Sequence, residues 1–142
     1  MKRLITNIAF VLTLLISCYS CKNDTSKTEV LAIQLEGLTL NNNKKWVANQ
    51  ETHMSMQRID SILKNNSSKD GETVGKALSK QTSYIIKSCD MTGEAHDQLH
   101  VVLVPILEEI GDLKDVKNPS VFEKKITTLQ QLTATYFKYF KN

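Results

Sequence analysis

The fold is decided by residues 72–110, ETVGKALSKQTSYIIKSCDMTGEAHDQLHVVLVPILEEI. Apolar side chains recur in this stretch at steps of three and four residues, the period of an α-helix with one buried face. The first such face, over residues 72–88, consists of Val74, Ala77, Leu78, Thr82, Ile85 and Cys89, and the second, over residues 94–110, of Leu99, Leu103, Ile106, Leu107 and Ile110. Only Asp90-Met91-Thr92-Gly93 separates them, so the two helices must pack antiparallel.

Two further helices flank this pair. The first begins at Asn49, a good N-cap residue, ends near Lys64, and has a buried face of Thr52, Met56, Ile59, Ile62 and Leu63. The last begins at the Asn118-Pro119 cap and carries Phe122, Ile126, Leu129, Leu132, Tyr136, Phe137 and Phe140. Gly111 is the expected C-cap of the third helix, and Pro105 should kink it. We therefore predict an all-α fold, an up-down-up-down four-helix bundle over residues 41–142.

The first seventeen residues have the pattern of a secretion signal. Lys2 and Arg3 precede a mostly apolar run that is too short to span a membrane, so residues 1–17 are interpreted as a cleaved signal peptide. The run ends in Leu15-Ile16-Ser17-Cys18, which resembles the lipobox of bacterial lipoproteins and predicts a lipid on Cys18. Cys21 follows Ser20 and is a rival for the modified cysteine. We expect an exported protein, lipid-anchored to the envelope at the periplasmic or surface face of the outer membrane.

Residues 18–40 are predicted to connect this anchor to the bundle. The polar stretch after Cys18 is typical of a flexible tether. Residues 30–40 alternate apolar and polar side chains and should form an extended arm along the outside of the domain. Removing Lys2 and Arg3 with the leader leaves sixteen basic residues against fifteen acidic ones. A nearly neutral chain without a basic stripe is not expected to bind nucleic acid.

The soft-metal ligands of the exported chain fall into two short windows. The first holds His53, Met54 and Met56, and the second holds Cys89, Met91, His96 and His100. Thiolate and thioether sulfur suit copper(I), and imidazole suits copper and zinc. In the predicted topology both windows lie at one end of the bundle. At about 100° per residue, Met56 and Cys89 face inward, His53, His96 and His100 border the apolar faces, and Met54 points to solvent.

Each of these features also has a purely structural explanation. Buried methionines usually fill gaps, a buried free cysteine is usually inert, and histidines can cap a bundle end. Enzymatic roles fit less well. Cys89 follows the negative end of a helix beside Asp90, which does not favour a nucleophilic thiolate. The paired Glu-x-x-His motifs of di-iron bundles are missing from the sequence, as is a Cys-x-x-Cys-His haem motif. We do not expect an enzyme.

Two motifs resemble those of a family of small uncharacterised bacterial lipoproteins. The first is the Asn-Asn-x-x-Lys-Trp entry at Asn41–Trp46, and the second is the Cys-x-Met-x-Gly-x-Ala-His-x-x-Leu-His turn at Cys89–His100. The resemblance implies a helical exported domain, loosely associated with the handling of heavy metals, and it names no reaction. His53 and Met56 are not part of the pattern.

The sequence therefore predicts an envelope lipoprotein that binds a metal, most suitably copper(I) with zinc as a second possibility, for sequestration or delivery. The expected ligands are Cys89, Met91, His96 and His100, with His53 and Met56 as auxiliary ligands. Its partners would be the membrane, through the lipid anchor, and a metal-efflux or other envelope protein. The alternative is a structural or protein-interaction lipoprotein without metal, which docks a partner through its bundle end or its arm.

Overall fold

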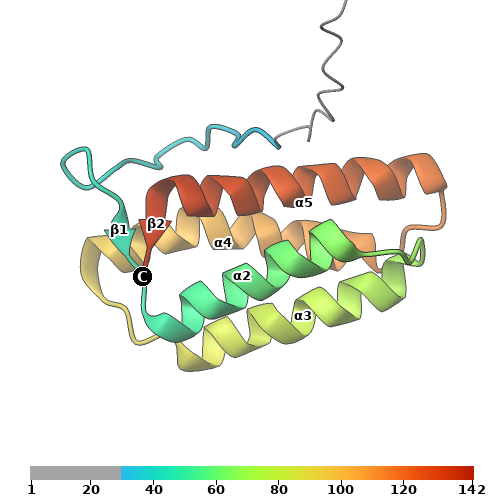
Figure 1. Cartoon of the computed structure of the whole chain (residues 1–142), viewed down its shortest axis with the longest axis horizontal. Coiled ribbons are helices and arrows are strands. Elements are labelled where there is room, and N and C mark those ends of the chain that lie inside the picture. The colour runs from blue at the N-terminus through green and yellow to red at the C-terminus, as the bar shows by residue number, and fades with distance from the viewer. Residues whose placement is uncertain (1–29) are drawn as a thin grey trace, which may run out of the picture.

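A computed structural model describes residues 30–142, and most of them are helical (Figure 1). The helices are α2 (Gln50–Asn65), α3 (Gly71–Ser88), α4 (Gly93–Leu113) and α5 (Pro119–Tyr139). They pack as a closed ring in which α2 also contacts α5, and the chain direction alternates from each helix to the next. The predicted all-α four-helix bundle is confirmed. The predicted signal peptide, Cys18 and the tether through residue 29 lie outside the described residues.

Two of the helices begin with side-chain caps that satisfy free backbone N–H groups. At the start of α3, the Asp70 carboxylate accepts a hydrogen bond from the Thr73 N–H at 2.9 Å. At the start of α5, the Asn118 side chain accepts from the backbone of Ser120 at 2.9 Å, and Pro119 occupies the first turn. None of the helices within residues 30–142 is long and apolar enough to cross a membrane.

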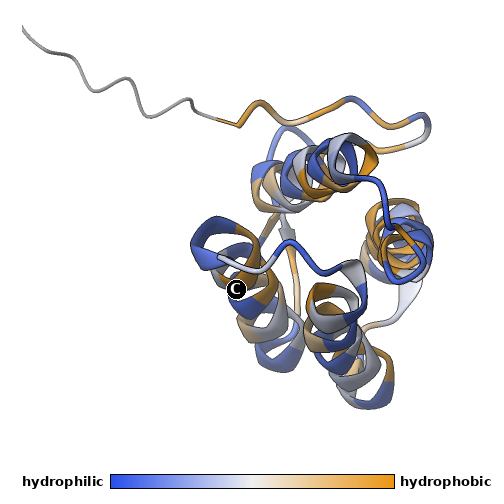
Figure 2. Ribbon diagram, turned by 90° about the vertical axis from the view of Figure 1, so that its right-hand side faces the viewer, coloured by the Kyte–Doolittle hydropathy of each residue, from blue (hydrophilic) through white to orange (hydrophobic). Residues whose placement is uncertain are grey.

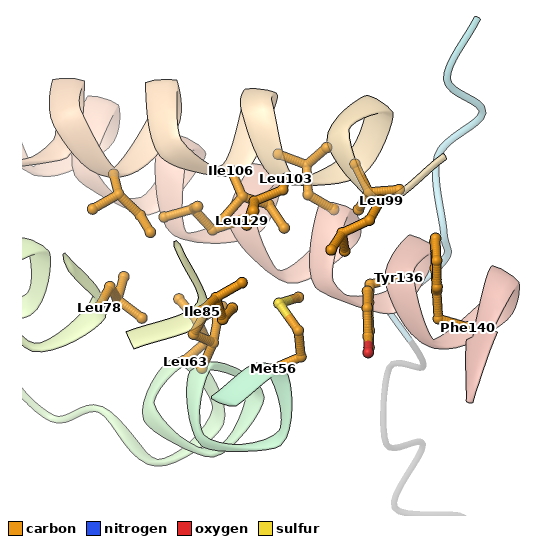
Figure 3. Close-up of a cluster of buried hydrophobic side chains, with 14 of the residues drawn as sticks. Met56, Leu63, Leu78, Ile85, Leu99, Leu103, Ile106, Leu129, Tyr136 and Phe140 are labelled. Carbon is orange, nitrogen blue, oxygen red and sulfur yellow. The ribbon is translucent and has the colours of Figure 1, made fainter. Parts of the chain in front are cut away.

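The four helices enclose a shared interior, which Figure 2 shows in a view along the bundle. Its fully buried large side chains include Met56, Ile85, Leu99, Tyr136 and Phe140, drawn with their neighbours in Figure 3. The rings of Tyr136 and Phe140 stack with centroids 5.0 Å apart and an interplanar angle of 3°. Aromatic pairs in such contact stabilise a core beyond the area that they bury. This stack closes the core at the end where α5 finishes.

The predicted helix boundaries and buried faces need three corrections. Gly111 is not a C-cap, because α4 continues to Leu113, whose fully buried side chain extends the inward face three residues beyond Ile110. Ala77 is exposed and not part of the buried face of α3. Ile62, Leu107 and Phe137 are only half-buried and pack against the edge of the core. At Phe137 the adjacent Tyr136 takes the inward position. Pro105 lies inside α4, as expected.

The arm and two short strands complete the fold. Residues 30–40 follow α5 along the outside of the bundle (Figure 1), held where Thr135 Oγ1 accepts from the Ile33 N–H and donates to the Ile33 carbonyl, each at 2.9 Å. After it, β1 (Trp46–Val47) pairs in parallel with β2 (Phe140–Lys141). The sequence pattern did not predict either strand. We call these paired strands the β1–β2 clasp, because they hold residues 140–141 against the residues that lead into α2.

Close packing at Gly71 gives a testable stability prediction. A Cβ at this position would lie 2.1 Å from the backbone oxygen of Leu113, so Gly71→Ala should destabilise the protein by about 1–3 kcal/mol, as overpacked sites do. A Cβ added at Gly111 would have no neighbour within 4 Å. Gly111→Ala should therefore stabilise α4 by about 0.5–1 kcal/mol. Urea unfolding of both variants, followed by circular dichroism, tests the pair; equal effects would contradict this packing.

Candidate metal site

The candidate ligands come from segments that meet at one end of the bundle, where α2 and α4 begin and α3 ends (Figure 1). Asn49 ties two of these segments together. It precedes α2 at the expected N-cap position, but its side chain makes no capping bond. Instead its amide nitrogen donates to the Ser88 carbonyl, the last residue of α3, at 2.9 Å. This bridge fixes the first turn of α2 against the last turn of α3.

His96 and His100 are the candidate ligands that the structure brings together. Their rings lie one helical turn apart on α4, with centroids 4.4 Å apart and an interplanar angle of 56°. Leu99, between them in sequence, is buried and anchors this part of the helix in the core. His96 is half-buried and His100 is exposed. The pair therefore stands on a rigid helix, close enough for both imidazoles to approach one ion, and open to solvent.

The two sulfur candidates of the second window flank the turn before this pair. Cys89 follows the last residue of α3, and its N–H donates to the Ile85 carbonyl at 2.9 Å. Cys89 and Met91 are half-buried and pack against the core. Gly93 has a φ of +64°, a left-handed conformation that glycine adopts without strain. It lets the chain reverse directly into α4, so that Cys89 and Met91 stay beside the start of that helix.

His53 instead contacts aromatic residues of α5. Its Nδ1 lies 3.2 Å from the Tyr136 hydroxyl, and its ring meets the edge of Phe137 with centroids 5.7 Å apart. Burial, and next the positive charge of Lys45, lower the pKa of His53. Burial raises the pKa of Tyr136, and a negative charge on Cys89 would raise it further. The Tyr136 hydroxyl is thus the polar partner of the His53 ring at this end of the bundle.

Met56 has no exposed surface. Figure 3 shows its side chain among apolar groups, between Ile85 and Tyr136. This is the surrounding of a methionine that fills core volume. A metal could reach its sulfur only after the core had opened. Met54, expected to point to solvent, is half-buried.

The residues therefore do not form one preassembled cluster. Within residues 30–142, no group of three or more His, Cys, Asp or Glu side chains is arranged to hold a metal ion. The close pair is His96 and His100, and His53 lies against α5. Tyr136 contacts His53 at this end of the bundle, and the sequence pattern did not place it in the candidate site. The signal that could have revealed it is a tyrosine on a buried helix face, whose hydroxyl needs a polar partner.

The environment of His53 predicts a pH dependence of stability. Because its pKa is lower in the folded state than the ordinary value of 6.5, the unfolded chain binds a proton first as the pH falls. The free energy of unfolding should therefore decrease as the pH falls through about 6.5, until the lowered folded pKa is reached. Urea unfolding between about pH 7.5 and pH 5.5 measures this loss.

His53→Gln should flatten that dependence, because the glutamine carries no charge at either pH and can still reach the Tyr136 hydroxyl. His100→Gln is the matched control, since it removes a histidine from an exposed position and should keep the dependence. A slope unchanged by His53→Gln would contradict the assignment.

We found no protein family, no curated protein and no solved structure that matches the chain. Function is therefore inferred from the residues and their geometry.

Proposed function

We propose that this protein is a lipid-anchored metal-binding protein of the bacterial envelope, suited above all to copper(I), which it sequesters or delivers. The observation that carries the proposal is the His96–His100 pair, with ring centroids 4.4 Å apart. Two imidazoles one turn apart on a helix can bind the same ion without any change in the backbone. The proposed role is binding and transfer, not catalysis.

The sulfur donors beside the pair favour copper(I) over zinc. Cys89 and Met91 belong to the turn that leads into α4, so a thiolate and a thioether lie in the same short segment of the chain as the two imidazoles. Thiolate and thioether ligands select copper(I), whereas zinc prefers tetrahedral sites built from cysteine, histidine and carboxylate. Copper(I) also accepts low coordination numbers. It therefore does not need the larger group of ligands that residues 30–142 do not provide.

The exposure of the pair supports transfer rather than permanent storage. His100 is exposed, and His96, Cys89 and Met91 are each half-buried. A partner protein could approach this end and displace the ligands one at a time. We propose a metal-efflux or other envelope protein as that partner. His53 and Met56 stay predicted auxiliary ligands, although their contacts are with Tyr136 and the core.

The anchor is proposed from the leader sequence. Leu15-Ile16-Ser17-Cys18 fits a lipobox better than the approach to Cys21, so Cys18 would carry the lipid and residues 19–29 would lead to the arm. Mass spectrometry of the mature N-terminus tests this choice, because a lipid on Cys21 would overturn it.

The alternative is a lipoprotein without metal that docks a partner through its bundle end or its arm, and the arm offers little free apolar surface for docking. Leu38 is buried, and Ile33 and Leu35 pack against the core, so most apolar side chains of the arm are already used within the domain. Leu31 and Leu40 are the exceptions, with 74% and 38% of their surfaces exposed. Two exposed leucines at opposite ends of the arm are an ordinary surface feature.

Anaerobic titration of the purified protein with copper(I), against a competing chelator, tests the proposal. We expect about one equivalent of copper(I) to be withdrawn from the chelator, and zinc to bind more weakly, because thioether is a poor zinc ligand. Cys89→Ser should weaken copper binding, while Met54→Leu, in the other window, should leave it unchanged. Failure of the wild-type protein to compete for copper(I) would overturn the proposal.

A further inference from the structure

A second candidate site lies where α2 packs against α3, two helices that do not carry the His96–His100 pair. It is a pocket of about 290 Å³, lined by Arg58 from α2 and by Lys80, Gln81, Ser83, Tyr84 and Lys87 from α3. We call it the α2–α3 pocket. Its volume is at the lower end of the range for small-molecule sites. It is therefore large enough for a small ligand or for the head group of a larger one.

The charge of this pocket is uncompensated. Arg58, Lys80 and Lys87 line it, and its lining contains no acidic side chain. None of the three takes part in an ion pair within residues 30–142. By contrast, Lys125 elsewhere in the bundle lies 3.0 Å from both Glu109 and Asp112. The pocket is therefore lined by three positively charged side chains that have no acidic partner within residues 30–142.

The sequence of α3 adds positive side chains to the pocket and no negative ones. No acidic residue occurs between Thr73 and Cys89, and positions 80, 84 and 87 fall within about 60° of one another around the helix. The nearest acid on the same side of α2 is Glu51, two turns from Arg58. Its carboxylate accepts a hydrogen bond from the Asn49 side chain at 3.1 Å. An anion in the pocket would therefore meet attraction from several cations and little local repulsion.

The other lining groups define what kind of anion fits. Ser83 and Gln81 offer hydrogen-bond donors, and the guanidinium of Arg58 can bind two oxygens of one phosphate at once. The walls are apolar, formed by the Tyr84 ring, which is 41% exposed, and by the aliphatic stems of the lysines. A carboxylate carries one negative charge and two acceptor oxygens, which a single cation can satisfy. A phosphate carries more charge and more acceptor oxygens, so it can use the three cations and the polar side chains of the pocket together.

We propose that the α2–α3 pocket binds a phosphate group carried on an apolar body. A soluble phosphate ester and the head group of a phospholipid share this chemistry. None of the residues that line the pocket is a proposed metal ligand, and α3 lies on the side of the bundle opposite the arm (Figure 1). Binding there would not compete with the proposed anchor or with the histidine pair.

Two soluble probes test the proposal and distinguish the sources. Phenyl phosphate stands for a soluble ester, and dihexanoyl phosphatidylglycerol, kept below its micellar concentration, stands for a phospholipid. Calorimetric titration of the full-length protein should show binding of at least one probe. The triple variant Arg58→Gln, Lys80→Gln, Lys87→Gln should bind it at least about tenfold more weakly, since charge-assisted hydrogen bonds are lost.

The matched control is the triple variant Lys44→Gln, Lys117→Gln, Lys124→Gln, which loses the same charge from exposed positions outside the pocket. It should bind like the wild type. Preference for phenyl phosphate would assign a soluble ester, and preference for the lipid a phospholipid. No binding of either probe, or equal weakening in both triple variants, would overturn the proposal. Lys80→Gln alone serves as the test if the first triple variant does not fold, and it should weaken binding as well.

Discussion

Phe140→Ala should lower the free energy of unfolding by about 3–5 kcal/mol, the cost of removing a large buried aromatic side chain. Phe140 is 1% exposed, stacks on Tyr136, and pairs with Trp46 in the β1–β2 clasp. Its removal would leave a cavity where the C-terminus is held against the entry of α2. Urea unfolding followed by circular dichroism measures the loss.

Phe137→Ala is the matched control for this prediction. The two phenylalanines lie three residues apart, Phe137 in the last turn of α5 and Phe140 in β2. Phe137 is only half-buried, and its ring contacts the side chain of His53. Its removal should cost clearly less, because solvent already covers part of the site. Equal losses in the two variants would contradict the packing of Phe140 in the core.

The helices could be predicted from the sequence because their buried faces repeat with the helical period. Met56, Ile59 and Leu63 on α2 are all buried, and the short turn from Asp90 to Gly93 fixes the antiparallel arrangement of α3 and α4. Helix ends were less predictable. Gly111 resembles a C-cap, yet the inward-facing Leu113 carries the helix onward, because burial of a leucine outweighs the local preference of glycine.

The strands β1 and β2 could not be predicted, because each is two residues long. Their pairing also joins residues far apart in the sequence, such as Trp46 and Phe140. The candidate site was predictable only in part. The spacing of His96 and His100 determines that they share a helix face. The orientation of His53 depends on its contacts with Tyr136 and Phe137. These two residues lie on α5, the helix farthest from His53 in sequence, so no local sequence pattern predicts the contacts.

Copper(I) binding should raise the thermal stability of the wild-type protein by a large amount. A ligand that binds only the folded state adds about 4 kcal/mol of stability when its concentration is a thousand times Kd. For a domain of about 100 residues, that corresponds to an increase in Tm of roughly 15 °C or more. We expect this rise in Tm to disappear in a variant that lacks the metal ligands but still folds.

The double variant His96→Ala, His100→Ala provides that comparison. His100 is exposed and His96 is half-buried, so the metal-free double variant should remain folded. Met54→Leu is the control, since it removes a thioether from the other window while nearly conserving volume. It should keep the full copper(I) effect.

The most direct test of the proposed metal site is the Tm of these three proteins, measured anaerobically with and without copper(I). We expect a clear rise in Tm for the wild type and for Met54→Leu, and none for the double variant. An equal rise in the wild type and the double variant would contradict the site, because copper would then bind elsewhere on the protein.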